Sequence, residues 1–111
     1  SEAFNLADKL GLSAATFFDI ASTASGGSWA LTNYCPVPGP VPKTPANFDY
    51  KPGFTVAMML KDLRLAQGAA ADSGVHTVLG QDAEQLFTAL SGLGHDALDF
   101  SVIYQMIAKK L

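Results

Sequence analysis

Apolar residues recur three or four positions apart along most of this chain, which is the spacing of amphipathic helices. In residues 1–10 they are Phe4, Leu6, Ala7 and Leu10, so the first element is expected to be a helix. No capping residue precedes it. We therefore expect residues 1–10 to be the end of a longer helix that begins upstream.

A second helix is expected to begin after Ser13, because serine caps helix N-termini, and to end at about Ser25. Leu12 and Phe17 lie at the two positions that form a hydrophobic staple across such a start. The next segment, residues 28–34, is short and aromatic, and its pattern leaves a helix and an extended chain both open.

All of the prolines lie in one segment, residues 35–53. They are Pro36, Pro38, Pro40, Pro42, Pro45 and Pro52. Proline fixes φ and lacks an N–H, so this segment is neither a regular helix nor a central strand. Tyr34, Phe48, Tyr50 and Phe54 lie within or beside it, and we expect these rings to pack the loop onto the protein.

The remaining sequence predicts three more helices, over residues 54–72, over residues 75–90, and from a cap at Asp96 to the end. The inward positions expected in the last two are Val78, Leu79, Ala83, Leu86, Phe87 and Leu90, then Leu98, Val102, Ile103, Met106 and Ile107. The expected fold is an all-α single domain, residues 1–111, of about five helices with one long proline-rich loop.

The composition argues against a disordered chain and against two classes of partner. With 111 residues, 49% of them apolar and 15% charged, the chain can form one modest core and is too apolar for a disordered tail. The net charge is −3 and the basic residues are scattered, so no nucleic-acid partner is expected. No apolar run approaches the roughly 20 residues that cross a bilayer, so no membrane partner is expected.

The residue types that usually carry chemistry do not assemble into a site from their spacing. Cys35 is the only cysteine, and neither it nor His76 and His95 has partners at metal-ligand spacing, so no metal site is expected. The histidines fall near expected helix starts, where capping or surface roles are usual. The acids, Asp96 and Asp99 among them, are expected mostly at helix ends or in solvent.

Lys61 lies in the expected helix over residues 54–72, which is apolar on almost every side and so predicts burial of more than one face. Ala57 and Leu65 flank Lys61 one turn to either side. A lysine in such a seam can face a cleft or pair with a carboxylate, a phosphate or a polar cofactor edge. Alternatively its stem lies on the core and its ammonium group reaches water.

Trp29 follows Gly26 and Gly27, and glycines beside a helix end permit the close approach of a ligand or of another backbone. The alternative is an ordinary helix end followed by a core tryptophan. The glycine pair is not a phosphate-binding loop, because no strand precedes it and its spacing does not match one.

Four segments, found in family order along the chain, resemble one known family. Residues 53–66 are similar to G-F-x6-K-D-L-x-L-A, and residues 33–39 to N-x-x-P-V-P-G. Residues 25–29 are similar to S-G-x-x-W, and residues 99–104 to D-F-S-x-V-x. The family is that of the β-hydroxyacid dehydrogenases, specifically the 3-hydroxyisobutyrate dehydrogenase branch, which is related to 6-phosphogluconate dehydrogenase.

The resemblance implies that the chain is the all-helical C-terminal domain of such an enzyme, which closes the cleft and contributes to a dimer. Residues 1–10 would be the end of the interdomain helix. The reaction would oxidise 3-hydroxyisobutyrate to methylmalonate semialdehyde, in valine catabolism, with hydride transfer to NAD. The Rossmann domain and the catalytic lysine would lie upstream of Ser1, so this fragment alone is expected to be inactive.

By the same resemblance, Lys61 would contact the NAD cofactor, and Trp29, Phe54 and Asp62 would help form the substrate pocket. No catalytic residue would come from this fragment. The other partners would be a small hydroxy acid and further copies of the chain, in a homo-oligomer formed through the helical domain. The protein would be cytoplasmic if bacterial and would lie in the mitochondrial matrix if eukaryotic.

Two alternatives stay open. The chain could be a helical dimerisation module without catalysis, or the same domain of a tartronate semialdehyde or glyoxylate reductase. The Pro36-Val37-Pro38-Gly39 loop favours hydroxyisobutyrate among the substrates. We also expect the isolated domain to self-associate, because separation from a Rossmann partner would expose an apolar patch.

Overall fold

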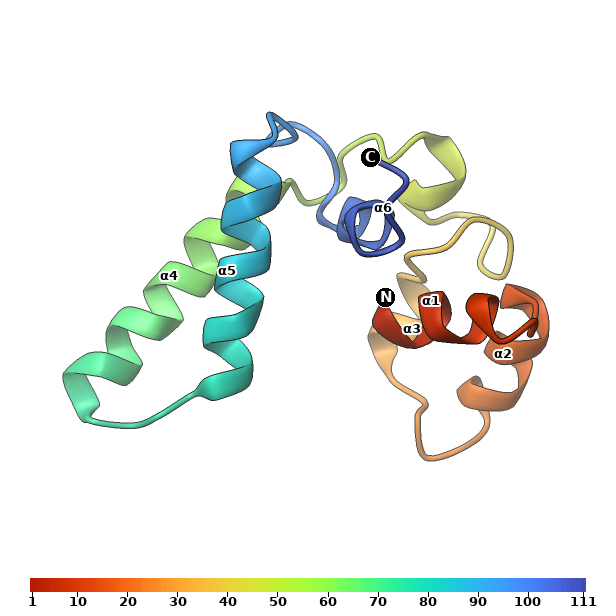
Figure 1. Cartoon of the computed structure of the whole chain (residues 1–111), viewed down its shortest axis with the longest axis horizontal. Coiled ribbons are helices and arrows are strands. Elements are labelled where there is room, and N and C mark those ends of the chain that lie inside the picture. The colour runs from red at the N-terminus through yellow and green to blue at the C-terminus, as the bar shows by residue number, and fades with distance from the viewer. The chain divides into compact units, whose positions relative to one another are not determined.

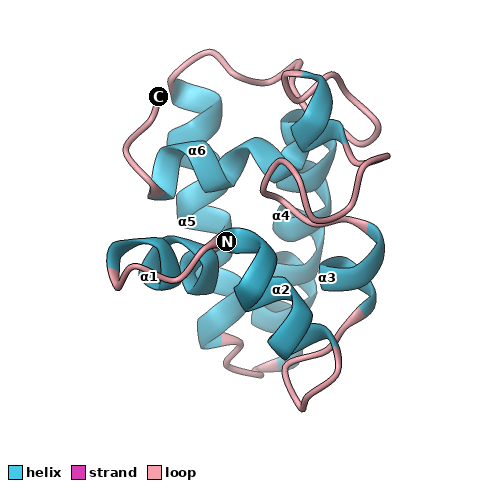
Figure 2. Ribbon diagram, turned by 90° about the vertical axis from the view of Figure 1, so that its right-hand side faces the viewer, coloured by secondary structure: helices cyan, strands magenta, loops and turns pink.

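The computed structural model describes residues 1–111 and consists of helices and loops without a sheet (Figures 1 and 2). The α-helices are α1 (Glu2–Lys9), α2 (Ala14–Ser22), α3 (Trp29–Asn33), α4 (Val56–Ser73), α5 (Val78–Gly92) and α6 (Ile103–Ile107). Two short 3-10 helices, η1 (Pro45–Phe48) and η2 (Phe100–Val102), complete the set. The expected all-α class with a long proline-rich loop is confirmed.

The chain divides into two compact units. The first contains residues 1–51 and 101–111, and the second contains residues 52–100. Each unit has its own set of buried residues. None of the helices combines the length and the apolar character needed to cross a membrane.

The core of the first unit joins both ends of the chain. It is formed by Phe4, Cys35, Val37 and Tyr104, all nearly inaccessible to solvent. The edge of the Phe4 ring meets the Phe17 ring at a centroid distance of 4.7 Å, which ties α1 to α2. Because α1 also packs against α6, elements far apart in sequence meet in this unit.

Serine caps set the starts of two helices in this unit. The Ser13 hydroxyl accepts a hydrogen bond from the Thr16 amide at 3.2 Å, as the sequence predicted for α2. The Ser28 hydroxyl accepts from the Leu31 amide at 3.2 Å, and this cap decides the ambiguous segment in favour of helix α3. The prediction that α2 extends to about Ser25 was wrong, because the Thr23 hydroxyl bonds back to carbonyls of the last turn.

The proline-rich loop is held together largely by one amide side chain. Asn47 accepts a hydrogen bond from the Gly39 amide at 2.8 Å and donates to the Val41 carbonyl at 2.9 Å and the Thr44 hydroxyl at 3.1 Å. Apart from η1, the segment has no regular structure, which confirms the prediction from its prolines.

Tyr50 packs the same loop down as expected, whereas Phe48 does not. Tyr50 is buried, and its hydroxyl donates to the Pro36 carbonyl at 2.9 Å and accepts from the Gln105 side chain at 3.2 Å. Phe48 is 55% exposed, so the prediction was wrong for that ring. Phe48 ends η1 immediately before Asp49, whose left-handed φ of 53° turns the chain and leaves the ring outside.

The second unit is built on an antiparallel hairpin of α4 and α5, which lie side by side in Figures 1 and 2. Thr55 caps α4 by accepting from the Met58 amide at 3.2 Å. At the other end, the Gly74 amide donates to Ala71 and the Val75 amide to Ala70, the two bonds of a Schellman motif. Because Val75 is tied to the end of α4, α5 begins at Val78 rather than at the predicted Val75.

Fewer residues of this hairpin are buried than the sequence pattern predicted. Among α4 residues only Val56 and Leu60 are buried, although the helix is apolar on almost every side. In α5, Phe87 and Leu90 are buried as expected. Four expected inward positions were wrong or only partly right: Val78, Leu79 and Leu86 are exposed, and Ala83 is half-buried. A two-helix hairpin has one seam between its helices, so the other faces stay open.

The expected cap of the last helix was also wrong. Asp96 lies in the turn after α5, where its backbone carbonyl accepts a hydrogen bond from the Ala57 amide at 3.2 Å. The last helix, α6, begins only at Ile103, after η2, and has no side-chain cap. The expected apolar face remains recognisable, since Val102 and Ile103 are buried.

Candidate functional site

The second unit fixes the start of α4 through a carboxylate from the segment that follows α5. Asp99 is completely buried. One of its oxygens, Oδ2, accepts hydrogen bonds from the Gly53 amide at 3.1 Å and from the Phe54 amide at 3.0 Å. The backbone just before α4 is therefore held by a group 45 residues further along the chain.

Backbone hydrogen bonds extend this junction in both directions. The Val56 amide donates to the Leu98 carbonyl at 2.9 Å, and the Phe100 amide donates to the Phe54 carbonyl at 2.8 Å. The Phe54 and Phe100 rings pack edge to face, with 5.9 Å between their centroids. Amides at a helix start lack partners within the helix, so residues 96–99 supply acceptors that water would otherwise provide.

Lys61 and Asp62, in the second turn of α4, form an ion pair with 2.9 Å between Nζ and Oδ1. Their side chains are 66% and 50% exposed. A pair this open contributes little stability, at most about 1 kcal/mol. Lys61 therefore pairs with a carboxylate, as the first interpretation of the sequence expected. Its ammonium group also reaches solvent, as the alternative expected.

A shallow groove of about 460 Å³ runs beside Lys61. Its lining residues come from α4 and from the end of α5 with the turn that follows: Ala57, Leu60, Lys61, Arg64, Leu65, Ser91 and Asp96. The groove combines two cationic side chains, Lys61 and Arg64, and one carboxylate, Asp96, with the apolar side chains of Ala57, Leu60 and Leu65. Each cation also lies within 4 Å of an acidic side chain, Lys61 of Asp62 and Arg64 of Glu84. Such a surface suits a ligand that has both a flat apolar part and an anionic or polar edge.

Trp29 belongs to the first unit, where it is 68% exposed and stacks on Tyr34 at a centroid distance of 5.9 Å. It is therefore not the core tryptophan of the simpler interpretation. A Cβ atom on Gly27 would lie 3.0 Å from the Ser22 carbonyl oxygen and 3.2 Å from that of Ala24. Glycine is needed at position 27 because the chain's own backbone, rather than a ligand, comes this close.

The four candidate residues thus fall into two groups. Lys61 and Asp62 touch each other, and Phe54 lies in the same unit at the junction before α4. Trp29 lies in the other unit. Sequence reasoning missed Asp99, which it expected at a helix end or in solvent. The available signal was its position between the apolar residues Leu98 and Phe100 within the D-F-S segment.

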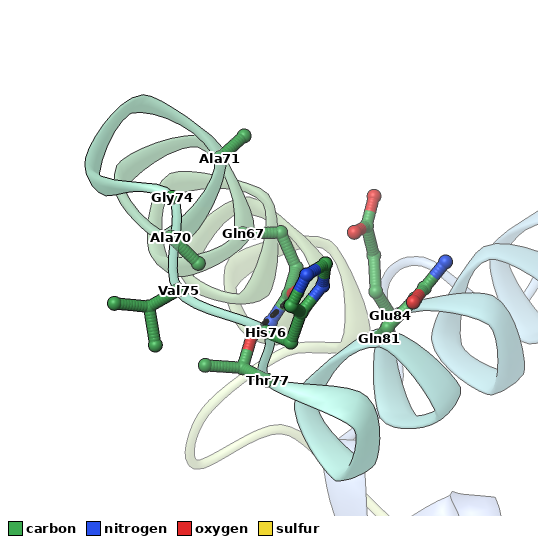
Figure 3. Close-up of a pocket in the computed structure, with 9 residues that line it drawn as sticks. All are labelled: Gln67, Ala70, Ala71, Gly74, Val75, His76, Thr77, Gln81 and Glu84. Carbon is green, nitrogen blue, oxygen red and sulfur yellow. Dashed lines mark hydrogen bonds between the residues drawn. The ribbon is translucent and has the colours of Figure 1, made fainter.

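A second pocket, of about 400 Å³, lies between the end of α4 and the beginning of α5 (Figure 3). Gln67, His76, Thr77, Gln81 and Glu84 give it a polar lining. The Thr77 hydroxyl donates to Gln67 Oε1 at 2.8 Å, which links the loop to α4. No group of three His, Cys, Asp or Glu side chains in the chain is arranged to hold a metal ion. No sequence pattern indicated this pocket.

A family model described as "NAD-binding of NADP-dependent 3-hydroxyisobutyrate dehydrogenase" matches residues 1–107. The chain belongs to this family. The resemblance seen in the sequence motifs is therefore confirmed, and the family's description is that of an NAD-binding domain.

Members of the 3-hydroxyisobutyrate dehydrogenase family in bacteria and animals are similar over nearly the whole chain. The probable 3-hydroxyisobutyrate dehydrogenase of Mycobacterium tuberculosis is 50% identical over 103 residues, 93% of this chain and 35% of that protein. The mitochondrial 3-hydroxyisobutyrate dehydrogenase of Drosophila melanogaster is 43% identical over 110 residues, 99% of this chain and 34% of that protein. The chain thus spans about a third of the length of these relatives.

The fold agrees with the same family. The solved structure of Mycobacterium tuberculosis 3-hydroxyisobutyrate dehydrogenase with L-serine matches with a TM-score of 0.92 and 48% identity. The match covers 96% of this chain and 36% of that one. This chain and the mycobacterial dehydrogenase therefore share the helical domain.

Proposed function

We propose that this chain is the helical C-terminal domain of an NAD-dependent dehydrogenase that oxidises 3-hydroxyisobutyrate to methylmalonate semialdehyde. The domain closes over the cofactor and the substrate, while the remaining two thirds of the enzyme bind most of the dinucleotide. The observation that carries this proposal is the open groove beside Lys61, in a domain whose family is described as NAD-binding.

The groove fits one edge of a dinucleotide rather than all of it. Lys61 and Arg64 present positive charge suited to a polar or anionic cofactor edge, and Leu60 and Leu65 present an apolar floor. When bound, NAD accepts the hydride from the substrate, and the protein's task is to orient the two. Asp62 lies 2.9 Å from the Lys61 ammonium group in an open ion pair, and we propose that it favours a Lys61 orientation toward the cleft.

Phe54 and Trp29 are each proposed, from the resemblance, to contact the substrate in the full-length enzyme. Phe54 is partly buried, and its backbone is held on both sides, by Asp99 and by Phe100. Trp29 is 68% exposed although its ring stacks on Tyr34, so it still offers apolar surface to a small molecule. The residue that transfers the proton belongs to the rest of the dehydrogenase, upstream of Ser1. The enzyme works in the cytoplasm if bacterial and in the mitochondrial matrix if eukaryotic. The name of the Drosophila relative, which includes the word mitochondrial, supports a mitochondrial location in the eukaryotic case.

The test is kinetic and uses the full-length enzyme with Lys61→Ala. Reduction of NAD is followed by absorbance with 3-hydroxyisobutyrate as substrate. Loss of a charge-assisted contact to the cofactor is expected to lower kcat/KM by roughly 10- to 100-fold. Lys43→Ala, which removes another exposed lysine from the proline-rich loop, is the matched control and is expected to behave as wild type. Wild-type kinetics for Lys61→Ala would remove Lys61 from the site.

L-Serine is a second candidate substrate, because the solved relative with a TM-score of 0.92 contains it. Both molecules are 3-hydroxy acids and differ at C2, where serine has an ammonium group and hydroxyisobutyrate has a methyl group. We expect the wild-type enzyme to have the higher kcat/KM for 3-hydroxyisobutyrate when both are assayed side by side, with tartronate semialdehyde and glyoxylate tested in the reverse direction. A full-length protein that is folded, dimeric and inactive with all four would instead support the dimerisation module.

A further inference from the structure

We propose that Asp99 is a positioning residue of the dehydrogenase, fixing the peptide before α4 so that Phe54 and Lys61 are presented correctly. This inference rests on the proposed function of those two residues. Asp99 itself is completely buried, and in this proposal it acts through the two backbone amides that it holds.

A carboxylate at this buried position needs compensating interactions. A buried carboxylate is strongly unfavourable unless hydrogen bonds compensate for lost hydration. Here the amides of Gly53 and Phe54 both donate to Oδ2, at 3.1 and 3.0 Å. The two amides directly precede the start of α4, where the helix dipole of an 18-residue helix also favours negative charge. A negative charge is therefore favourable at this position. An apolar side chain of similar size would leave the amides of Gly53 and Phe54 without the carboxylate as acceptor.

These two hydrogen bonds fix the backbone that carries Phe54. Two successive amides bound to one oxygen leave the peptide between Gly53 and Phe54 a single orientation, and the Phe54 ring then rests against Phe100. The first turn of α4 is fixed as well, because Val56 and Ala57 donate to the carbonyls of Leu98 and Asp96.

The junction held by Asp99 is connected to Lys61 through helix α4. Lys61 lies five residues after Val56 in the same continuous helix, so a rotation at the start of α4 moves its ammonium group. Asp96 and Lys61 also line the same groove, so the segment that carries Asp99 forms one of its walls. A shift of about 1 Å in a positioning element is enough to lower the rate by as much as 100-fold.

The experiment compares Asp99→Asn with wild type in the full-length enzyme, by steady-state kinetics with 3-hydroxyisobutyrate and NAD. Asparagine keeps the size and one acceptor oxygen but removes the charge. We expect kcat/KM to fall by roughly 10- to 100-fold in protein that circular dichroism shows to be folded at the assay temperature. Asp82→Asn, an exposed acid on α5, is the matched control and is expected to match wild type.

A double-mutant cycle separates positioning from general weakening of the fold. If Asp99 acts through Lys61, the Asp99→Asn substitution should cost several-fold less in a Lys61→Ala background than in the wild-type background. A cost that is the same in both backgrounds, and also the same in a Phe54→Ala background, would overturn the proposal. So would wild-type kinetics for Asp99→Asn.

If Asp99→Asn does not fold, hydrogen exchange on the wild-type enzyme still decides the question. The amides of Gly53 and Phe54 should exchange far more slowly than that of Gly26, an exposed turn residue whose amide has no hydrogen-bond acceptor. Exchange at free-loop rates would show that Asp99 does not hold them. The proposed function fails separately, when the wild-type enzyme oxidises neither 3-hydroxyisobutyrate nor L-serine.

Discussion

Tyr50 shows how much one hydroxyl group can hold together in the first unit. It donates to Pro36 and accepts from Gln105, so it links two parts of the proline-rich region to α6. Tyr50→Phe removes both bonds and leaves two polar groups without this partner. We expect the free energy of unfolding of the chain to fall by about 1–3 kcal/mol, measured by urea denaturation at neutral pH.

The same hydroxyl predicts a pH dependence. Burial raises the pKa of Tyr50 above its ordinary value of 10.0, although the hydrogen bond from Gln105 opposes this. Because the folded pKa lies above the unfolded one, the contribution to stability is complete below about pH 10 and is lost as the pH rises through the folded pKa. Unfolding free energy should therefore decline above pH 10 more steeply in wild type than in Tyr50→Phe. Parallel pH curves for the two proteins would contradict this.

At the residue scale, the sequence predicted contacts between near neighbours better than contacts across the chain. The Ser13 cap joins residues three apart, and a capping preference is enough to find it. Asp99 was expected at a helix end or in solvent because its partners, Gly53 and Phe54, are 46 and 45 residues away. Composition gives no sign that two distant amides need an acceptor.

At the scale of the element, α4 contains one residue that weakens it. Gly68 is exposed in the middle of the helix, and a Cβ atom added there would meet nothing within 4 Å. Gly68→Ala is expected to raise the free energy of unfolding by about 0.5–1 kcal/mol, because glycine loses more backbone entropy in a helix than alanine. Thermal and urea unfolding of the wild-type and Gly68→Ala chains would measure this difference in unfolding free energy.

Gly74 is the matched control for that substitution. A Cβ atom added at Gly74 would also meet nothing within 4 Å, but its φ of 69° ends α4 in the left-handed region. Gly74→Ala should therefore lower stability by about 1 kcal/mol, opposite in sign to Gly68→Ala. A stabilising effect at both positions would mean that the helix end does not depend on the Schellman motif.

Helices were easier to predict from the sequence than their limits. The helix from Val56 to Ser73 was expected over residues 54–72, within two residues at each end, because its apolar pattern is long and contains no proline. The start of α5 was set three residues too early, since Val75 has the apolar character of a helix residue. Its amide belongs to the end of α4, and only the hydrogen bond to Ala70 reveals that.

At the scale of the whole molecule, the main difference from expectation is how much apolar surface stays open. Periodicity identifies the apolar face of a helix but not the surface that covers it. Val78 and Leu79 were assigned to the core on that basis, and they are 63% and 85% exposed. The chain spans about a third of the length of its relatives. Under the proposed function, the remainder of the enzyme or other copies of the chain would cover these side chains.

This exposure predicts that the isolated chain self-associates. Leu65, Val78 and Leu79 leave most of their side chains open on the hairpin of α4 and α5, and burying such side chains gains about 25 cal/mol for each Å² removed from water. Sedimentation velocity across micromolar concentrations should show species larger than 11.6 kDa that increase with concentration.

Leu79→Gln together with Leu65→Gln should shift the distribution toward monomer, whereas Gln85→Ser, a change at an exposed polar position of α5, should not. Because the driving force is apolar, sulfate should strengthen the association. A chain that sediments only as monomer over the whole range would mean that these side chains do not form an interface between copies by themselves.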